Sequence, residues 1–98
     1  MTWWQSNSEE NIINKIHWLL DQSYDALIIN PAAFSHTSIA ITDALLALKI
    51  PVAEVHLSNV YRRESFRQTL LTATASSIIM SGLGKNAYYY AALALLEK

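Results

Sequence analysis

Polar and ionisable side chains gather directly after the short apolar runs of this 98-residue sequence. The main ones are Asn30, His36, His56, Ser58 and Arg67. An imidazole exchanges a proton near neutral pH, and a guanidinium group holds a carboxylate through two parallel hydrogen bonds. Amide and hydroxyl groups can bond to the hydroxyl groups of a ligand. Together these residue types suit a site for a small hydroxylated carboxylic acid.

The elements that must position these side chains alternate along the chain. Short apolar runs predict strands covered on both faces, which is typical of a parallel sheet, at 26–29, 51–55 and 76–80. Apolar residues at helical spacing predict helices at 6–20, 38–48, 64–71 and 86–97. This alternation predicts an α/β fold with right-handed crossovers. Because ligands bind outside the carboxyl ends of parallel strands, we expect the polar groups to converge on one rim.

Local signals mark the ends of these elements. Ser6 and Glu9 fit a capping box at the start of the first helix. Thr37 or Ser38 can cap the second helix. Gly82-Leu83-Gly84 predicts a tight turn, because glycine tolerates positive φ. The turn lacks the third glycine of a dinucleotide-binding fingerprint, so no nucleotide cofactor is expected there.

Composition limits the function classes. A hydrophobic content of 52% is enough for a packed core, and we expect residues 1–98 to form one domain. A net charge of −1 without a basic stripe argues against nucleic acid as a partner. With no cysteine, disulfides and thiolate chemistry are excluded. Neither a signal peptide nor an apolar run of membrane-spanning length is present, so we expect a cytoplasmic protein without a membrane partner. The spacing of histidine and aspartate predicts no metal site.

Several of these residues have a second interpretation. Asn30 precedes Pro31 and could serve only as a turn residue, and His36 could simply cap its loop. Asp43, on the second helix, fits either a surface charge or an interface residue. Glu54 lies within a buried strand and therefore requires a partner, for which Arg63 is the expected candidate.

Several motifs, in order and spacing, make the sequence resemble type II 3-dehydroquinate dehydratase over essentially its whole length. The matching segments are Asn30-Pro31-Ala32-Ala33-Phe34-Ser35-His36-Thr37-Ser38, Asp43-Ala44, Glu54-Val55-His56-Leu57-Ser58-Asn59, Arg63-Glu64 and Phe66-Arg67. The resemblance implies a flavodoxin-like parallel sheet flanked by helices, of whose five strands about three are present here. It also implies a homo-oligomer, with trimers that form a dodecamer.

The resemblance further implies a reaction and a set of roles. The family removes water from 3-dehydroquinate in the shikimate pathway through an enolate, and no cofactor is implied. His56 would be the proton donor, and the backbone at Leu57 and Ser58 would hold the substrate carboxylate. The remaining roles would be ring hydroxyl binding by Asn30, His36 and Arg67, contact with a neighbouring subunit's site by Asp43, and support by Glu54 with Arg63.

Two departures from the family pattern affect these expectations. Ala32 and Ala33 occupy a loop that contains glycine in the family, and a methyl group there could crowd the ligand. No counterpart is seen for the family's N-terminal portion, which holds its first strand and the lid that carries the catalytic tyrosine and an arginine. Thr2–Gln5 would be the tail of the family's second strand. The strand at 26–29 would then be an exposed edge, and activity would be impaired. The alternatives are a non-catalytic binding or assembly remnant and one half of a split enzyme.

Overall fold

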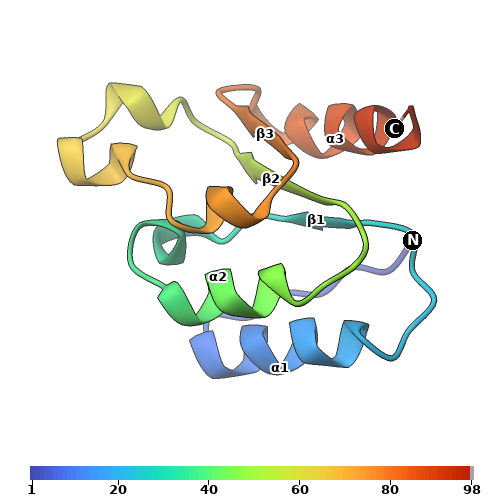
Figure 1. Cartoon of the computed structure of the whole chain (residues 1–98). Coiled ribbons are helices and arrows are strands. Elements are labelled where there is room, and N and C mark those ends of the chain that lie inside the picture. Colours follow the sequence, from blue (N-terminus) through green and yellow to red (C-terminus); the bar gives the residue numbers. More distant parts are fainter. Residues whose placement is uncertain (98) are drawn as a thin grey trace.

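The molecule is built on a small parallel sheet, in a computed structural model that describes residues 1–97. Its strands are β1 (Leu27–Ile29), β2 (Val52–His56) and β3 (Ile78–Ser81), and they lie in the order β1-β2-β3 (Figure 1). Both strand pairs are parallel, with Ile29 opposite Glu54 and His56 opposite Ser81. The predicted α/β class, parallel sheet and three strands are therefore confirmed.

Helices cover both faces of this sheet (Figure 1). On one face, α1 (Glu9–Leu19) and α2 (Ile39–Leu46) form an apolar cluster with β2, centred on the buried Ile16, Leu45 and Val52. On the other face, α3 (Ala87–Leu96) packs through Ala87 and Ala91 against Ala53 and Val55. Small side chains on α3 let the helix lie close to the strand, so β2 is buried on both sides.

The alternation of side chains along β2 determines which groups share a face. All five residues of β2 are buried. Ala53 and Val55 point toward α3, so Val52, Glu54 and His56 point toward the opposite face. There β2 contacts a 3₁₀ turn, Thr72–Ala75. The strand therefore places two ionisable side chains beside each other in an otherwise closed layer.

The capping box predicted for the first helix is wrong. The N-cap of α1 is Ser8, whose Oγ accepts the backbone N–H of Asn11, while Ser6 Oγ accepts the N–H of Ser8. The helix thus begins at Glu9, and Glu9 belongs to its first turn. For α2, of the two predicted candidates, Ser38 is the N-cap.

The segment after β2 is also less regular than predicted. Instead of one helix at 64–71, it contains short 3₁₀ turns at Val60–Arg62 and Ser65–Gln68 before the turn at Thr72–Ala75. Side-chain bonds replace helical ones here, because Asn59 Oδ1 accepts the N–H of Tyr61 and Gln68 Nε2 donates to two backbone carbonyls. The Gly82-Leu83-Gly84 turn agrees with the prediction, since both glycines have positive φ.

Strand β1 lies at one edge of the sheet. Among the residues that the structure describes it pairs with β2 alone, and its three residues are half-buried. Thr2–Gln5 joins no strand; Thr2 bonds to the hydroxyl of Tyr24, and the Trp3 ring packs edge-on against Tyr88. The predicted exposed edge is confirmed. Within residues 1–97, no helix combines the length and apolar character needed to cross a membrane.

The buried cap of α2 gives a first testable expectation. Ser38 is almost fully buried, and its Oγ accepts the N–H of Ile41 at 2.9 Å. Replacing Ser38 with alanine should lower the free energy of unfolding by about 1–2 kcal/mol, because the orphaned N–H has no access to water. The matched control is Ser8→Ala, at a more exposed cap, and urea unfolding measures both. A loss at Ser38 no larger than at Ser8 would contradict this account.

Candidate functional site

A pocket of about 270 Å³ lies where the chain leaves the carboxyl ends of β1 and β2. Its lining residues are Asn30, Ala32, Ala33, His36, His56, Leu57, Ser58, Val60, Arg63 and Arg67. Seven of the predicted site residues are among them, contributed by the chain just after β1, the end of β2 and the segment 60–68 that follows it. The expected convergence on one rim is therefore present in the fold.

The carboxylate of Glu54 does not line the pocket but lies next to His56, which does, and it is fully inaccessible to solvent. One of its oxygens lies 2.8 Å from Nε2 of His56, and the other accepts the hydroxyl of Thr72 at 2.5 Å. The expected pairing of Glu54 with Arg63 is wrong for the part of the chain that the structure describes, because Arg63 is exposed at the pocket. The side chain of His56 is 5% exposed and lines the pocket, and its bond to the buried carboxylate of Glu54 fixes its position there.

The second histidine is fixed by the backbone. His36 Nδ1 lies 3.0 Å from the carbonyl oxygen of Thr69. A carbonyl can only accept, so Nδ1 carries the hydrogen and Nε2 keeps its lone pair. The ring also meets Phe66 edge-on, with 6.5 Å between centroids. His36 is thus oriented by a loop that is distant in sequence, which goes beyond the simple loop cap considered as its alternative.

Asn30 has both of the roles considered for it, that of a turn residue and that of a pocket residue. Its Oδ1 accepts the N–H of Ala32, and its Nδ2 donates to the hydroxyl of Tyr88 at 3.2 Å. Ala32 has a φ of +52°, a region that disfavours residues with a Cβ atom, and its methyl group lines the pocket. The sequence did not identify Tyr88 as this partner, since nothing in a run of three tyrosines marks which one faces the sheet.

The turn after β2 presents unpaired backbone donors. No acceptor for the N–H groups of Leu57 or Ser58 is found within residues 1–97. The carbonyls around them are held, because Gly84 donates to Leu57 at 2.8 Å and Ser81 Oγ donates to Ser58 at 3.0 Å. Gly82 lies against Asn59, since a Cβ at Gly82 would be in van der Waals contact with the Cβ of Asn59 at 3.4 Å. Two adjacent N–H groups on a fixed turn suit an anionic ligand group.

Arg67 reaches the pocket while paired with Glu64. Its Nε lies 2.9 Å from Glu64 Oε2, and its guanidinium lies 5.1 Å from the Phe66 ring centroid. Hydrogen bonding to the backbone N–H of Glu64 lowers the pKa of that carboxyl, and the charges of Arg67 and Arg63 lower it further. The free end of the guanidinium group remains available to a ligand.

This ion pair predicts a small pH dependence of stability. Because the pKa of Glu64 is depressed in the folded chain, the contribution of the pair is complete above the ordinary carboxyl pKa. It is lost as the pH falls through the lowered value. The urea midpoint of Glu64→Gln should therefore fall slightly below that of the parent chain near neutral pH and coincide with it in acid. Glu97→Gln serves as the control, and a difference that grows in acid would contradict the sign.

Asp43 is the one predicted substrate-binding residue that does not line the pocket. It lies exposed on α2. Its expected contact with a neighbouring subunit stays a prediction, as do the roles assigned to the other site residues.

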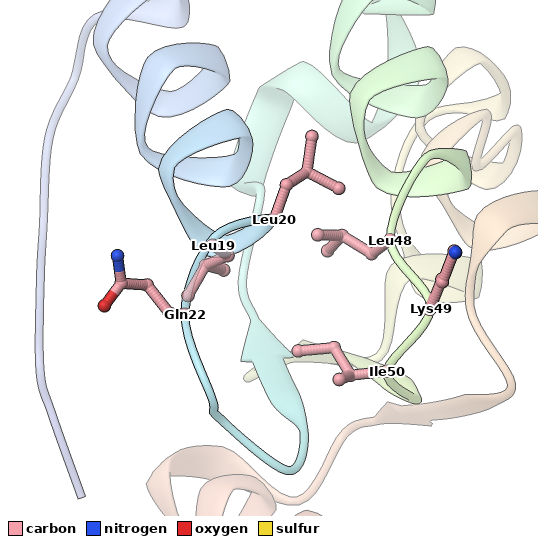
Figure 2. A pocket seen from close by; sticks show the side chains of 6 residues that line it. All are labelled: Leu19, Leu20, Gln22, Leu48, Lys49 and Ile50. Carbon is pink, nitrogen blue, oxygen red and sulfur yellow. The ribbon is translucent and has the colours of Figure 1, made fainter.

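Another hollow, of about 350 Å³, lies at the ends of α1 and α2, beside the segments that lead into β1 and β2 (Figure 2). Its lining residues come from the last residue of α1 and from the segments after α1 and α2, and they are Leu19, Leu20, Gln22, Leu48, Lys49 and Ile50. Apolar side chains surround it, and Lys49 is its only ionisable group. None of the predicted site residues lines it, whereas seven of them line the first pocket.

Comparisons with known proteins find relatives that match nearly the whole of this chain. The family model described as dehydroquinase class II matches residues 1–96. A 3-dehydroquinate dehydratase of Aliarcobacter butzleri is 47% identical over 97 residues, which are 99% of this chain and 58% of that protein. The enzyme of the same name from Idiomarina loihiensis is 51% identical over 92 residues, or 94% of this chain and 60% of that protein.

Solved structures that resemble this chain are named for the same family. The type II dehydroquinase from Propionibacterium acnes has a TM-score of 0.90 and 39% identity, covering 96% of this chain and 64% of that one. The type II dehydroquinase from Butyrivibrio crossotus has a TM-score of 0.92 and 40% identity, with coverage of 94% and 64%. The chain therefore spans about 60% of the length of the relatives it matches.

Proposed function

Because the chain belongs to the class II dehydroquinase family, we propose that its pocket binds 3-dehydroquinate and supplies the acid half of the dehydration to 3-dehydroshikimate. The observation that carries this proposal is the single pocket lined by His56, the Leu57–Ser58 turn and Arg67 together with Asn30 and His36. The relatives are named for the reaction, and the chain spans about 60% of their length, so the activity is proposed here for the chain itself.

The proposed chemistry follows from the groups at the pocket. The N–H groups of Leu57 and Ser58 hold the substrate carboxylate. Arg67, Asn30 and His36 bind ring hydroxyl groups. Once the proton beside the ketone has left, the enolate expels a hydroxyl group, and a proton from His56 turns that group into water. Asp43 acts at the site of a neighbouring subunit in a homo-oligomer.

The tyrosine base that the family resemblance implies is not among the residues that line this pocket. Of the residues that line it in the described part of the chain, the ionisable ones are histidines and arginines, and neither a phenol nor a carboxylate is among them. The family resemblance assigns the base to a tyrosine on a lid. We therefore propose that the 98 residues alone are impaired in catalysis.

A second candidate is one half of a split enzyme, and the unpaired side of β1 favours it. An open parallel edge can accept a strand from another chain. Mixing the chain with a separately expressed segment that carries a strand and a tyrosine-bearing loop should then restore turnover. No gain in turnover with both partners folded would exclude this candidate.

Calorimetric titration with 3-dehydroquinate tests the binding proposal. We expect saturable binding by the parent chain and an affinity about 10- to 100-fold lower for Arg67→Ala, because a hydrogen bond to a charged group contributes about 1.5–3 kcal/mol. The matched control is Arg62→Ala, which removes a nearby exposed arginine that does not line the pocket. Folded parent protein that releases no heat, or equal losses for the two variants, would overturn the proposal.

A further inference from the structure

We infer that the buried Glu54–Thr72 pair fixes the tautomer of His56, so that Nε2 is tied to the carboxylate and Nδ1 is the ring nitrogen that serves the pocket. The part of this inference that concerns proton donation rests on the proposed function. The part that concerns the tautomer stands on the geometry of three side chains. Glu54 and Thr72 are positioning residues here, since both act through His56.

The first step is the bond between the histidine and the carboxylate. His56 Nε2 and Glu54 Oε2 are 2.8 Å apart in a fully buried environment. An ordinary carboxyl group binds a proton less tightly than an ordinary imidazole, so the hydrogen between them belongs to the ring. Glu54 then only accepts, and a neutral His56 carries its hydrogen on Nε2.

The second step is that Thr72 fixes the orientation of the Glu54 carboxylate. Thr72 is fully buried in the turn at Thr72–Ala75, and its hydroxyl donates to Glu54 Oε1. With that oxygen held, the plane of the carboxylate is set and Oε2 stays directed at His56. Thr72 thus connects an irregular segment of the chain to the orientation of the imidazole ring.

The third step concerns the free nitrogen. Within residues 1–97, His56 Nδ1 has no hydrogen-bond partner, and the only buried side-chain nitrogen or oxygen without one is Ser76 Oγ. Nδ1 therefore retains access to the pocket that His56 lines. When the ring takes up a second proton, Nδ1 is the nitrogen that carries it and can pass it to a departing hydroxyl group.

His36 provides an internal reference. Its Nδ1 donates to the carbonyl of Thr69, so its hydrogen lies on Nδ1 and its lone pair on Nε2. The two histidines at one pocket should therefore hold opposite tautomers. A general property of the solvent or of the pocket would give both rings the same tautomer.

Long-range ¹H–¹⁵N spectra of the histidine rings test the inference without any substrate. At a pH where the imidazoles are neutral, we expect a protonated Nε2 and a pyridine-type Nδ1 for His56, and the reverse for His36. Signals are assigned with His17→Asn and His36→Asn. A protonated Nδ1 on His56 in the parent chain would overturn the inference.

Variants of the carboxylate and of Thr72 complete the test. In Glu54→Gln, Thr72 still donates to the side-chain oxygen, so the amide NH₂ faces His56 and the tautomer should switch to Nδ1–H. In the double variant Glu54→Gln with Thr72→Val, the amide is free to turn, and a mixture of tautomers is expected. An unchanged Nε2–H in the single variant, or a complete switch in the double variant, would overturn the role of Thr72. Circular dichroism checks the fold of each variant. If Glu54→Gln does not fold, Thr72→Val alone is used, and the Nε2–H signal of His56 should then be broadened. A signal identical to that of the parent chain would count against the role of Thr72.

Addition of 3-dehydroquinate separates this inference from the proposed function. Binding should perturb Nδ1 of His56 more than Nε2. Spectra that do not change on addition of the ligand would remove the proposed function and leave the tautomer assignment intact. A larger perturbation of Nε2 would show that the wrong ring nitrogen had been assigned to the pocket.

Discussion

Replacing Glu54 with alanine is expected to lower the free energy of unfolding by about 3–5 kcal/mol. The change leaves the hydroxyl of Thr72 and Nε2 of His56 without their partner in the closed layer of the sheet, and it opens a cavity beside them. Small domains have a total stability of about 5–15 kcal/mol, so a large part of the variant should be unfolded at moderate urea concentrations.

Two controls separate this effect from the loss of any carboxylate. Glu54→Gln keeps the volume and a hydrogen-bonding end, and it should lose much less stability than Glu54→Ala. Glu9→Ala removes an exposed carboxylate from the first turn of α1 and should cost well under 1 kcal/mol. Urea unfolding followed by circular dichroism gives all three values. An alanine variant as stable as the glutamine variant would mean that the Glu54 bonds contribute little.

The second large effect concerns turnover. We expect the isolated chain to convert 3-dehydroquinate at least about 10²–10⁴-fold more slowly than a full-length relative, because a positioned general base typically contributes that factor and no tyrosine lines the described pocket. The ultraviolet absorbance of the conjugated enone product measures the rate. The enzyme from Aliarcobacter butzleri serves as the full-length reference.

Any residual turnover should depend on His56. In His56→Asn the remaining rate should fall to the uncatalysed level, while binding of 3-dehydroquinate falls much less, because the acid acts on the departing group and the carboxylate is held by the adjacent turn. His17→Asn is the matched control, since His17 is exposed on α1. A rate for the parent chain comparable with that of the full-length relative would show that the base is supplied within these residues.

Much of the fold could be predicted because it depends on strong local patterns. The three apolar runs, the helical spacing between them and the glycine turn each specify one element, and parallel order follows from their alternation. The convergence of Asn30 and His56 followed from the same order, since residues after parallel strands meet at one edge. The exact cap of α1 did not follow, because Ser6 and Ser8 both offer a suitable hydroxyl.

The pairing of Glu54 with His56 could have been predicted from the sequence. His56 follows two positions later on the same strand, and side chains at that spacing share a face. The strand spacing therefore indicates His56 as the partner of Glu54, whereas opposite charge alone indicated Arg63. Thr72 could not be found in this way, because it comes from an irregular segment whose turns depend on side-chain bonds made only in the fold.

The unpaired side of β1 has a consequence for how the protein behaves as a sample. Leu27 donates its N–H to Pro51 on the β2 side, so the backbone groups of Ile28 point to the open side, where no strand within residues 1–97 satisfies them. Resistance to denaturant depends on interactions within one chain, whereas association of chains through the unpaired side of β1 increases with protein concentration. A preparation with a respectable urea midpoint can therefore still lose soluble material when it is concentrated, and dilution would protect it where added stability would not.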